Sequence, residues 1–435
     1  METKKLLNVL VLSVVIALSS CKKDSPAPII DPVLDCNGID LGTSMLDDCG
    51  TCQQAYIYNM VTHEATLLDD ATGVEAGDNE MVIMPNDPMN PYWNSSCYTF
   101  TVDGWVSSTV AYGGQTARLD MASEMMSAIA SNGTTTEALM GMFENSGDYF
   151  SDADLNASTK QIKSKTAASN AVTSAAQMAI HASFDSWFLD YATNVAPIVG
   201  TTTMAASGSA GMAGNRELNA KGMEYDQIVA KSLIGALCLD QVVNGYLSDS
   251  KIGDAVNNID RTENNNSTAR EHHFDEGFGY VYGKFGVDNI MGDLSGDGLL
   301  GKYLNKYSNY KETVFNAFVS GRAAIVSNNS SVRDEQAQII KETLSIVVAT
   351  RAESYLRDAA NEADNLSPDY FHALSEAYGF ILSLQFTYTA NGTPYFSHEE
   401  VNTMLEALEA GNGFWDRTEA ELIAMADAIN AVSGL

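Results

Sequence analysis

Histidine and acidic side chains gather in one short segment, residues 271–276, whose sequence is Glu-His-His-Phe-Asp-Glu. On a helix, His273 and Glu276 are three residues apart and His272 and Glu276 four, so either imidazole shares a helix face with the Glu276 carboxylate. An imidazole nitrogen together with a carboxylate oxygen suits zinc, iron or manganese. Two ligands from one helix do not complete a metal site, so the remaining ligands must come from other helices.

A second pair of the same kind, His372 and Glu376, lies four residues apart and therefore also on one helix face. Pairing the two helices predicts a mixed site for iron or zinc, made of His272, His273, Glu276, His372 and Glu376. The alternative is that these side chains only satisfy hydrogen bonds and hold the helices in place. Glu271 is left out of the site because a capping box with Thr268 already accounts for it.

No common catalytic motif accompanies these residues. The chain has no His-Glu-x-x-His of zinc peptidases, no Gly-x-Ser-x-Gly elbow, no P-loop and no dinucleotide fingerprint. Residues 293–298 open like a calcium loop, but Leu304 stands where the bidentate glutamate is required, which favours a glycine-rich turn. We therefore expect binding and name no catalytic residue. A metal-dependent hydrolase with Glu276 or Glu376 as its base is the alternative.

The start of the chain has the layout of a lipoprotein export signal. Two lysines precede an apolar run over residues 6–18, and Leu-Ser-Ser then leads into Cys21, which resembles a lipobox. The run is shorter than the roughly 20 residues of a membrane-spanning helix. We predict a signal peptide at 1–20, lipid on Cys21 and a polar tether over 21–34. The anchor makes a membrane the first predicted partner, and we expect an outer-membrane lipoprotein, either surface-exposed or facing the periplasm.

The chain is strongly acidic, with 24 Lys and Arg residues against 56 Asp and Glu residues and a formal net charge of −32. This charge repels phosphate backbones, so no nucleic-acid partner is expected. It also attracts cations, which fits a metal-binding role and equally an adaptation to salty surroundings. A metal ion and an envelope protein are therefore the other predicted partners.

Residues 35–96 differ from the rest of the chain in their richness in Pro, Gly, Asn and Asp, with β-like runs at 56–58 and 81–84. The cysteines in and beside this segment are Cys36, Cys49, Cys52 and Cys97. In an oxidising compartment they most simply form two disulfides, in one of three pairings, and such links stabilise a segment with little core. Zinc is the alternative, disfavoured because no second paired motif follows the first. We predict an irregular, Cys-rich β module over 35–96.

The sequence from about residue 115 onward is typical of helices. Capping side chains mark helix starts at Thr268, Ser367, Ser397 and Thr418. Apolar residues between 235 and 246 recur at helical spacing and predict a helix that buries Cys238 as a core thiol. The fold class that follows is an all-α domain over 97–435, built as one helical bundle or two in tandem.

The segment His273-Phe274-Asp275-Glu276 matches the His-x-x-Glu signature of imelysin-like proteins, although Glu271 stands where their motif has glycine. A closer resemblance is to an uncharacterised family of bacterial lipoproteins, over roughly Cys97 to the C-terminus. The segments that carry it are Tyr-Thr-Phe at 98–100, Gly-Gly-Gln-Thr-Ala-Arg at 113–118, Glu-His-His-Phe-Asp-Glu-Gly-Phe-Gly-Tyr at 271–280 and His-Ala-Leu-Ser-Glu at 372–376. The imelysin resemblance implies a helical fold of two bundles and a link to iron acquisition, and from its signature only His273 and Glu276 carry over.

These observations together predict a lipid-anchored cell-envelope protein that binds a ligand, with a metal such as iron held at the His/Glu site. The first alternative is the metal-dependent hydrolase. The second is a surface interaction protein in which the His/Glu cluster is structural. In that protein the partner would bind the Cys-rich module or an aromatic patch including Trp93, Trp105 or Trp415.

Overall fold

The computed structural model describes residues 34–47, 52–62, 64–87, 90, 98–102, 107–261, 266–285 and 293–434. Several predictions lie outside these residues: the signal peptide at 1–20, lipidation of Cys21, the tether up to residue 33, and the roles of Cys49, Cys97, Trp93 and Trp105. The described residues therefore test the Cys-rich module in part and the helical domain almost throughout.

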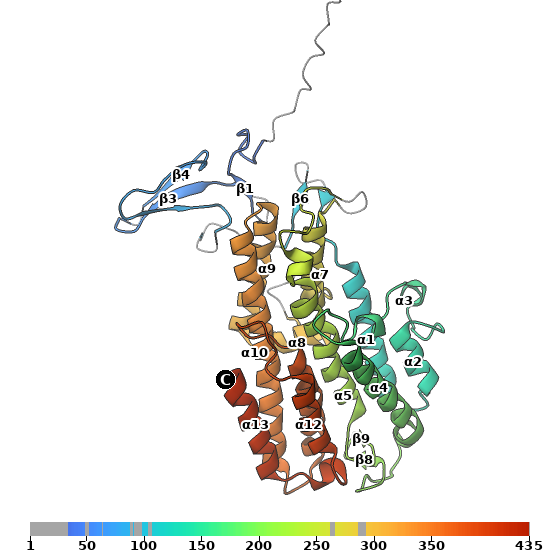
Figure 1. The fold of residues 1–435 in the computed structure, drawn as a ribbon. Coiled ribbons are helices and arrows are strands. Elements are labelled where there is room, and N and C mark those ends of the chain that lie inside the picture. The colour runs from blue at the N-terminus through green and yellow to red at the C-terminus, as the bar shows by residue number, and fades with distance from the viewer. Residues whose placement is uncertain are drawn as a thin grey trace, which may run out of the picture.

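Helices make up most of the described chain beyond residue 112 (Figure 1). They are α1 (Gly113–Ile129), α2 (Thr136–Glu144), α3 (Ala153–Ala157), α4 (Ser174–Asp190), α5 (Tyr225–Leu233), α6 (Asp249–Ile252), α7 (Ala269–Tyr282), α8 (Leu300–Leu304), α9 (Ser308–Val326), α10 (Ser330–Glu362), α11 (Pro368–Ser383), α12 (His398–Glu409) and α13 (Glu419–Ser433). The longest helix, α10, packs against α9, α11 and α13, and α11 packs in turn against α5. The predicted mostly α-helical fold is confirmed.

Local capping chemistry sets several helix starts, as the sequence predicts. The side-chain oxygens that accept a backbone N–H at the predicted starts of α7, α11, α12 and α13 are those of Thr268, Ser367, Ser397 and Thr418. Three of these caps are full capping boxes, in which a glutamate side chain also accepts the N–H of the cap residue. Short single-turn helices complete the chain: η1 (Lys163–Lys165), η2 (Tyr191–Val195), η3 (Ala196–Ile198), η5 (Ser295–Asp297), η6 (Leu384–Phe386) and η7 (Gly413–Asp416).

The central rod of the fold is α5 continued directly by η4 (Ile234–Tyr246), a segment of π-helix. Apolar spacing predicts one buried face here, whereas the structure buries every residue from 228 to 243, Cys238 included. Gly235 permits this packing, because a Cβ at that position would lie 2.2 Å from the Ser383 Oγ of α11. This rod, Tyr225–Tyr246, is the described helix that by length and composition could cross a membrane, and most of it is buried inside the protein.

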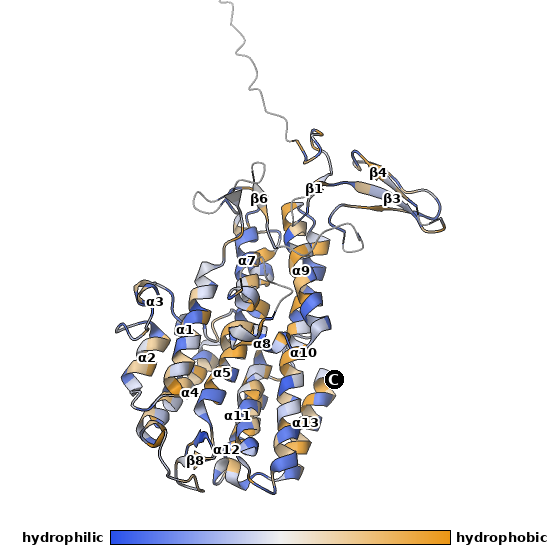
Figure 2. Ribbon diagram, turned by 180° about the vertical axis from the view of Figure 1, so that it is seen from behind, coloured by the Kyte–Doolittle hydropathy of each residue, from blue (hydrophilic) through white to orange (hydrophobic). Residues whose placement is uncertain are grey.

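One continuous hydrophobic core joins the helices, with buried members from Tyr98 to Ile429. Figure 2 shows the pattern that produces it, since hydrophobic and hydrophilic residues share the same helices. Burying the apolar side of each helix against its neighbours is the main favourable contribution to folding, at about 25 cal/mol per Å². The core thus gives a rigid frame on which polar side chains can be fixed.

Strands are short and lie mainly in the N-terminal module, which projects from one end of the helical domain (Figure 1). They are β1 (Met45–Leu46), β2 (Cys52–Gln53), β3 (Ala55–Asn59), β4 (Ala65–Leu68), β5 (Glu80–Ile83), β6 (Thr101–Val102), β7 (Ser107–Ser108), β8 (Gly211–Ala213) and β9 (Arg216–Leu218). The order β4-β3-β5 forms an antiparallel sheet, and Asn86 Nδ2 donates to Ser327 Oγ at 2.8 Å, which joins the module to the end of α9. The β8–β9 pair forms an antiparallel hairpin in the chain before α5.

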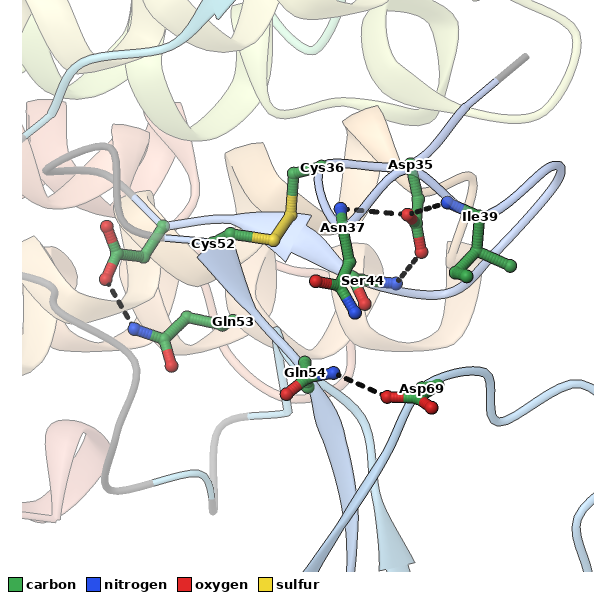
Figure 3. Close-up of a disulfide and its surroundings, with 10 residues drawn as sticks. Asp35, Cys36, Asn37, Ile39, Ser44, Cys52, Gln53, Gln54 and Asp69 are labelled. Carbon is green, nitrogen blue, oxygen red and sulfur yellow. Dashed lines mark hydrogen bonds between the residues drawn. A yellow bond between two sulfur atoms is a disulfide. The ribbon is translucent and has the colours of Figure 1, made fainter. Parts of the chain in front are cut away.

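A disulfide between Cys36 and Cys52 links the first described loop of the module to β2 (Figure 3). Beside it, the Asp35 carboxylate accepts N–H groups of Asn37, Ile39 and Ser44, each at 2.9 Å. These bonds lower the pKa of Asp35 although burial opposes them. Asp35 therefore closes the loop by local hydrogen bonds.

Candidate functional site

The side chains of the first predicted cluster, residues 271–276 on α7, bind different partners. Glu271 Oε2 accepts the Thr268 N–H at 2.9 Å, and the same carboxylate binds Arg261 at 2.6 Å. Its structural role therefore agrees with its exclusion from the predicted site. The next acidic residue of the segment, Asp275, is fully buried and pairs with Arg322, whose Nε lies 2.9 Å from Asp275 Oδ1.

Asp275 and Arg322 are the centre of a buried network that ties three segments together. Tyr98 donates its hydroxyl proton to Asp275 Oδ1 at 2.8 Å, and the second guanidinium nitrogen donates to Thr109 Oγ1, also at 2.8 Å. The guanidinium also lies 4.7 Å from the ring centre of Phe100. The two charges pair inside the core, and the network joins α7, α9 and the chain before α1.

The predicted ligands His273 and Glu276 face different partners. The His273 ring donates from Nδ1 to the Lys251 carbonyl at 2.8 Å, and burial lowers the pKa of this histidine. Glu276 Oε1 instead accepts from Gln115 Nε2 at 3.0 Å. His272 is the histidine nearer to Glu276, with 3.9 Å between His272 Nε2 and Glu276 Oε2. His273 thus has one ring nitrogen already engaged, and burial favours its neutral form.

The second predicted pair, His372 and Glu376 on α11, is held by charged neighbours. His372 Nδ1 lies 2.7 Å from Glu224 Oε2, and its Nε2 lies 3.6 Å from Glu376 Oε2. The other oxygen of Glu376 binds Lys231 Nζ at 2.9 Å and accepts from the Tyr303 hydroxyl at 3.0 Å. Burial acts to raise the pKa of Glu376, but Lys231, His372 and Tyr355 together outweigh it and the net pKa is lowered. Glu376 is therefore an ionised carboxylate whose charge Lys231 already balances.

The two His/Glu pairs do not meet in one group. α7 lies toward the end of the domain that carries the β module, whereas His372 contacts Arg216 of β9 near the opposite end (Figure 1). Within the described parts of the chain, no group of three or more His, Cys, Asp or Glu side chains could hold a metal ion. The five side chains predicted for iron or zinc thus lie at two separate places in the fold, with different partners, and do not form a common donor set.

The Lys231 ammonium that neutralises Glu376 also lines a hollow of about 270 Å³ between α1, α5 and the turn from η5 into α8. The residues that line it are Ala122, Ser123, Met126, Ser127, Asp226, Gln227, Ala230, Lys231, Asp297, Gly298, Leu299 and Lys302. Four of these are ionisable, two acids and two bases. They come as two pairs with the same spacing, because Asp226 on α5 is followed five residues later by Lys231, and Asp297 of η5 is followed five residues later by Lys302 on α8. Concave sites with several convergent ionisable groups are the usual places where proteins bind ligands.

Two of the four ionisable groups are fixed by neighbours. Lys231 binds both Glu376 and the Gln227 side-chain oxygen, so its ammonium is held at the wall of the hollow. Asp297 Oδ2 accepts the Gly301 N–H at 2.6 Å, and Oδ1 accepts the Leu299 N–H at 3.3 Å. Burial raises the pKa of Asp297 to about 7 in spite of these bonds. The carboxyl therefore changes its charge close to neutral pH.

The other two ionisable groups, Asp226 and Lys302, form no ion pair with any described residue. Asp226 accepts a hydrogen bond from Gln227 Nε2 at 2.6 Å, and the Lys302 ammonium lies 5.7 Å from the ring centre of Tyr303. Burial raises the pKa of Asp226, with repulsion from Glu224 adding to it. Burial lowers the pKa of Lys302, with repulsion from Lys231 adding to it. Lys231 offsets part of the shift of Asp226, and Glu376 and Asp297 offset part of the shift of Lys302, but burial outweighs them and neither group has a described ion-pair partner.

Sequence reasoning missed all four ionisable residues of the hollow. Asp297 was noticed only as part of the calcium-like segment 293–298, and the glycine-rich turn preferred there is what the structure shows. Trp415, the described member of the predicted aromatic patch, is half-buried and packs its ring 4.5 Å from that of Phe371. The sequence signal that could have pointed to the hollow is the repeated Asp-x-x-x-x-Lys spacing, at 226–231 and 297–302.

Comparison with known proteins identifies a family without an assigned activity. No curated protein and no solved structure matches the chain. A family model described as a domain of unknown function, DUF4856, matches residues 95–435, which includes every helix described above and the whole lining of the hollow. The chain therefore belongs to the DUF4856 family.

Proposed function

We propose that this protein is a lipid-anchored binding protein of the cell envelope, and that its ligand occupies the hollow between α1, α5 and α8. The observation that carries the proposal is the pair of half-buried, unpaired charges on Asp226 and Lys302, which line the same hollow. Burying a charge without a partner is costly, so proteins seldom keep such groups unless a ligand uses them.

The residues around the hollow support binding by a preformed site. Glu376 holds Lys231 in place, and His372 and Glu224 extend the same network toward β9. Most of the lining comes from α1 and α5, which pack on the continuous core, so little reordering of these helices is needed when a ligand enters. In this account Glu376 and His372 are positioning residues, which is a different task from the metal ligation that their spacing suggested.

The lipid anchor is the second part of the proposal and rests on the sequence around Cys21. The apolar run, the small residues before Cys21 and the polar segment after it support acylation and an outer-membrane location. Replacing Cys21 by serine should move the protein from the membrane fraction to the soluble fraction of expressing cells. Retention of the Cys21→Ser protein in the membrane fraction would contradict the anchor and leave the ligand site untouched.

Saturation-transfer NMR with a panel of small polar compounds tests the ligand site. The panel contains amines, carboxylates, zwitterions and neutral sugars, and the full chain is compared with two tryptophan variants. Ser127→Trp places a bulky ring at the exposed rim of the hollow, whereas Ser186→Trp makes the same change on an exposed position of α4. We expect at least one compound that binds the parent and Ser186→Trp proteins and fails to bind Ser127→Trp. If no compound shows this pattern, the hollow is not a binding site for these classes and the proposal is wrong.

A further inference from the structure

We infer that the ligand of the hollow is a small zwitterion, a molecule with one ammonium and one carboxylate group such as an amino acid. This inference rests on the proposed function, because it names the class of ligand for the same site. The ammonium group would lie at Asp226 and the carboxylate at Lys302.

The signs of the unsatisfied charges carry the argument. Of the four ionisable groups, Lys231 is neutralised by Glu376 and Asp297 is engaged by two backbone N–H groups. What remains for a ligand is one carboxylate, on Asp226, and one ammonium, on Lys302. A ligand that complements both must carry one cationic and one anionic group.

A ligand with a single charge would complement the hollow less well. A simple amine would pair with Asp226 but leave Lys302 half-buried without a direct ion-pair partner, and a simple carboxylate would do the reverse. Each unpaired charge keeps its desolvation cost, whereas a zwitterion relieves both costs at once. The two groups that remain, Asp226 and Lys302, carry opposite charges that sum to zero, so a ligand of zero net charge leaves them balanced.

The size and the remaining lining agree with a ligand of amino-acid dimensions. The volume of about 270 Å³ lies below the roughly 300–1,000 Å³ typical of pockets for drug-sized molecules. Apolar contact is available from Met126, Leu299 and Ala230, which line the same hollow. The net charge of −32 repels free anions at long range, and a zwitterion avoids that repulsion.

Calorimetric titration of the full chain with matched compounds tests the inference. The zwitterions are the standard α-amino acids and the series from glycine through β-alanine and 4-aminobutyrate to 6-aminohexanoate, which varies the distance between the two charges. For each tight binder the control is the amine and the carboxylate with the same carbon skeleton, for example butylamine and butyrate. We expect at least one zwitterion to bind at least about tenfold more tightly than both of its single-charge controls.

Two variants separate direct pairing from a structural effect. In Asp226→Asn the advantage of the zwitterion over the carboxylate control should vanish while its advantage over the amine persists. In Lys302→Met the zwitterion should lose its advantage over the amine control and keep its advantage over the carboxylate control, because only the contact with the ligand's carboxylate is lost. Two matched controls, Lys306→Met and Asp358→Asn, remove the same charges at exposed positions that do not line the hollow, and should leave each affinity within about twofold.

The outcomes distinguish this inference from the proposed function. An amine, a carboxylate or a sugar that binds as tightly as any zwitterion and is blocked by Ser127→Trp would overturn the zwitterion while leaving the hollow as a binding site. Equal loss of all three compound types in both Asp226→Asn and Lys302→Met would also overturn it, since the charges would then only shape the hollow. Failure of every class of compound to bind in a Ser127-dependent way would overturn the proposed function itself.

Discussion

Replacing Lys231 by methionine removes the cation that neutralises Glu376 and keeps a side chain of similar shape. In the folded protein Lys231 Nζ lies 2.9 Å from Glu376 Oε1, and the two side chains are only 6% and 7% exposed. Breaking a buried ion pair by removing one partner costs about 3–5 kcal/mol, because the other charge stays buried without compensation. Glu376 keeps its hydrogen bond from Tyr303, so we expect Lys231→Met to lower the free energy of unfolding by about 3 kcal/mol, the lower end of that range.

The same variant should change how stability depends on pH. In the parent the pKa of Glu376 is lowered, so its contribution to stability is present above the ordinary pKa of 4.5 and is lost as the pH falls through the lowered value. Without Lys231 the largest remaining effect is burial, which raises the pKa of Glu376. The protonated carboxyl then carries no unpaired charge, so the stability difference between parent and variant should shrink between pH 7 and pH 5.

Urea unfolding followed by circular dichroism at these two pH values measures the effect. Lys306→Met is the control, because it removes an exposed lysine from the chain just after α8 and should change stability by less than about 0.5 kcal/mol. The double variant Lys231→Met/Glu376→Gln should recover most of the loss, since no unpaired charge remains and glutamine still accepts from Tyr303. If Lys231→Met lowers the free energy of unfolding by less than about 1 kcal/mol, or by the same amount at both pH values, the claim that the Lys231–Glu376 ion pair stabilises the wall of the hollow is refuted.

Three further predictions concern the networks outside that pair. Arg322→Met should lower the free energy of unfolding by about 3–5 kcal/mol in urea titrations, because the buried Asp275 carboxyl loses the partner that balances it; a change under about 1 kcal/mol would contradict this. Cys36→Ser opens a link between residues 16 apart, so the N-terminal module should lose up to about 3 kcal/mol and be cleaved faster than in the parent by chymotrypsin, which acts after aromatic residues such as Tyr56 and Tyr58, while the helical dichroism stays unchanged. For Asp297 the rise in pKa from 3.8 to about 7 corresponds to about 4 kcal/mol of stability that is present at acid pH and lost as the pH rises to 7. The stability of the parent relative to Asp297→Asn should therefore fall between pH 5 and pH 7 and level off above pH 7, and a flat difference would contradict the buried carboxyl.

The features that the sequence predicted well depend on residues close together in the chain. The capping boxes at Thr268 and Ser397 need only an acceptor and a glutamate three residues later, and both are present. The apolar spacing at 235–246 indicates a buried helix, which is correct. The π-helical form and burial on all sides of that segment were not predictable, because they depend on how closely the distant Ser383 approaches Gly235.

The site was harder to predict because its pairs join distant parts of the chain. Helical spacing places His372 and Glu376 on one face of α11, as expected, but it gives no information on what faces them. The structure places Lys231 there, 145 residues earlier in the sequence, and a lysine that neutralises a carboxylate leads to a different chemistry from metal ligation. The unpaired charges of Asp226 and Lys302 are likewise visible only when burial is known.

A single calorimetric titration tests whether the hollow between α1, α5 and α8 binds a ligand. The panel compound with the strongest NMR response is titrated calorimetrically into the parent, Ser127→Trp and Ser186→Trp proteins, all as the full chain. The account predicts one binding site per chain in the parent and Ser186→Trp proteins, with affinity at least about tenfold weaker in Ser127→Trp, because the added ring fills the rim of the hollow. Equal affinity in all three proteins would contradict the account, since the compound would then bind elsewhere.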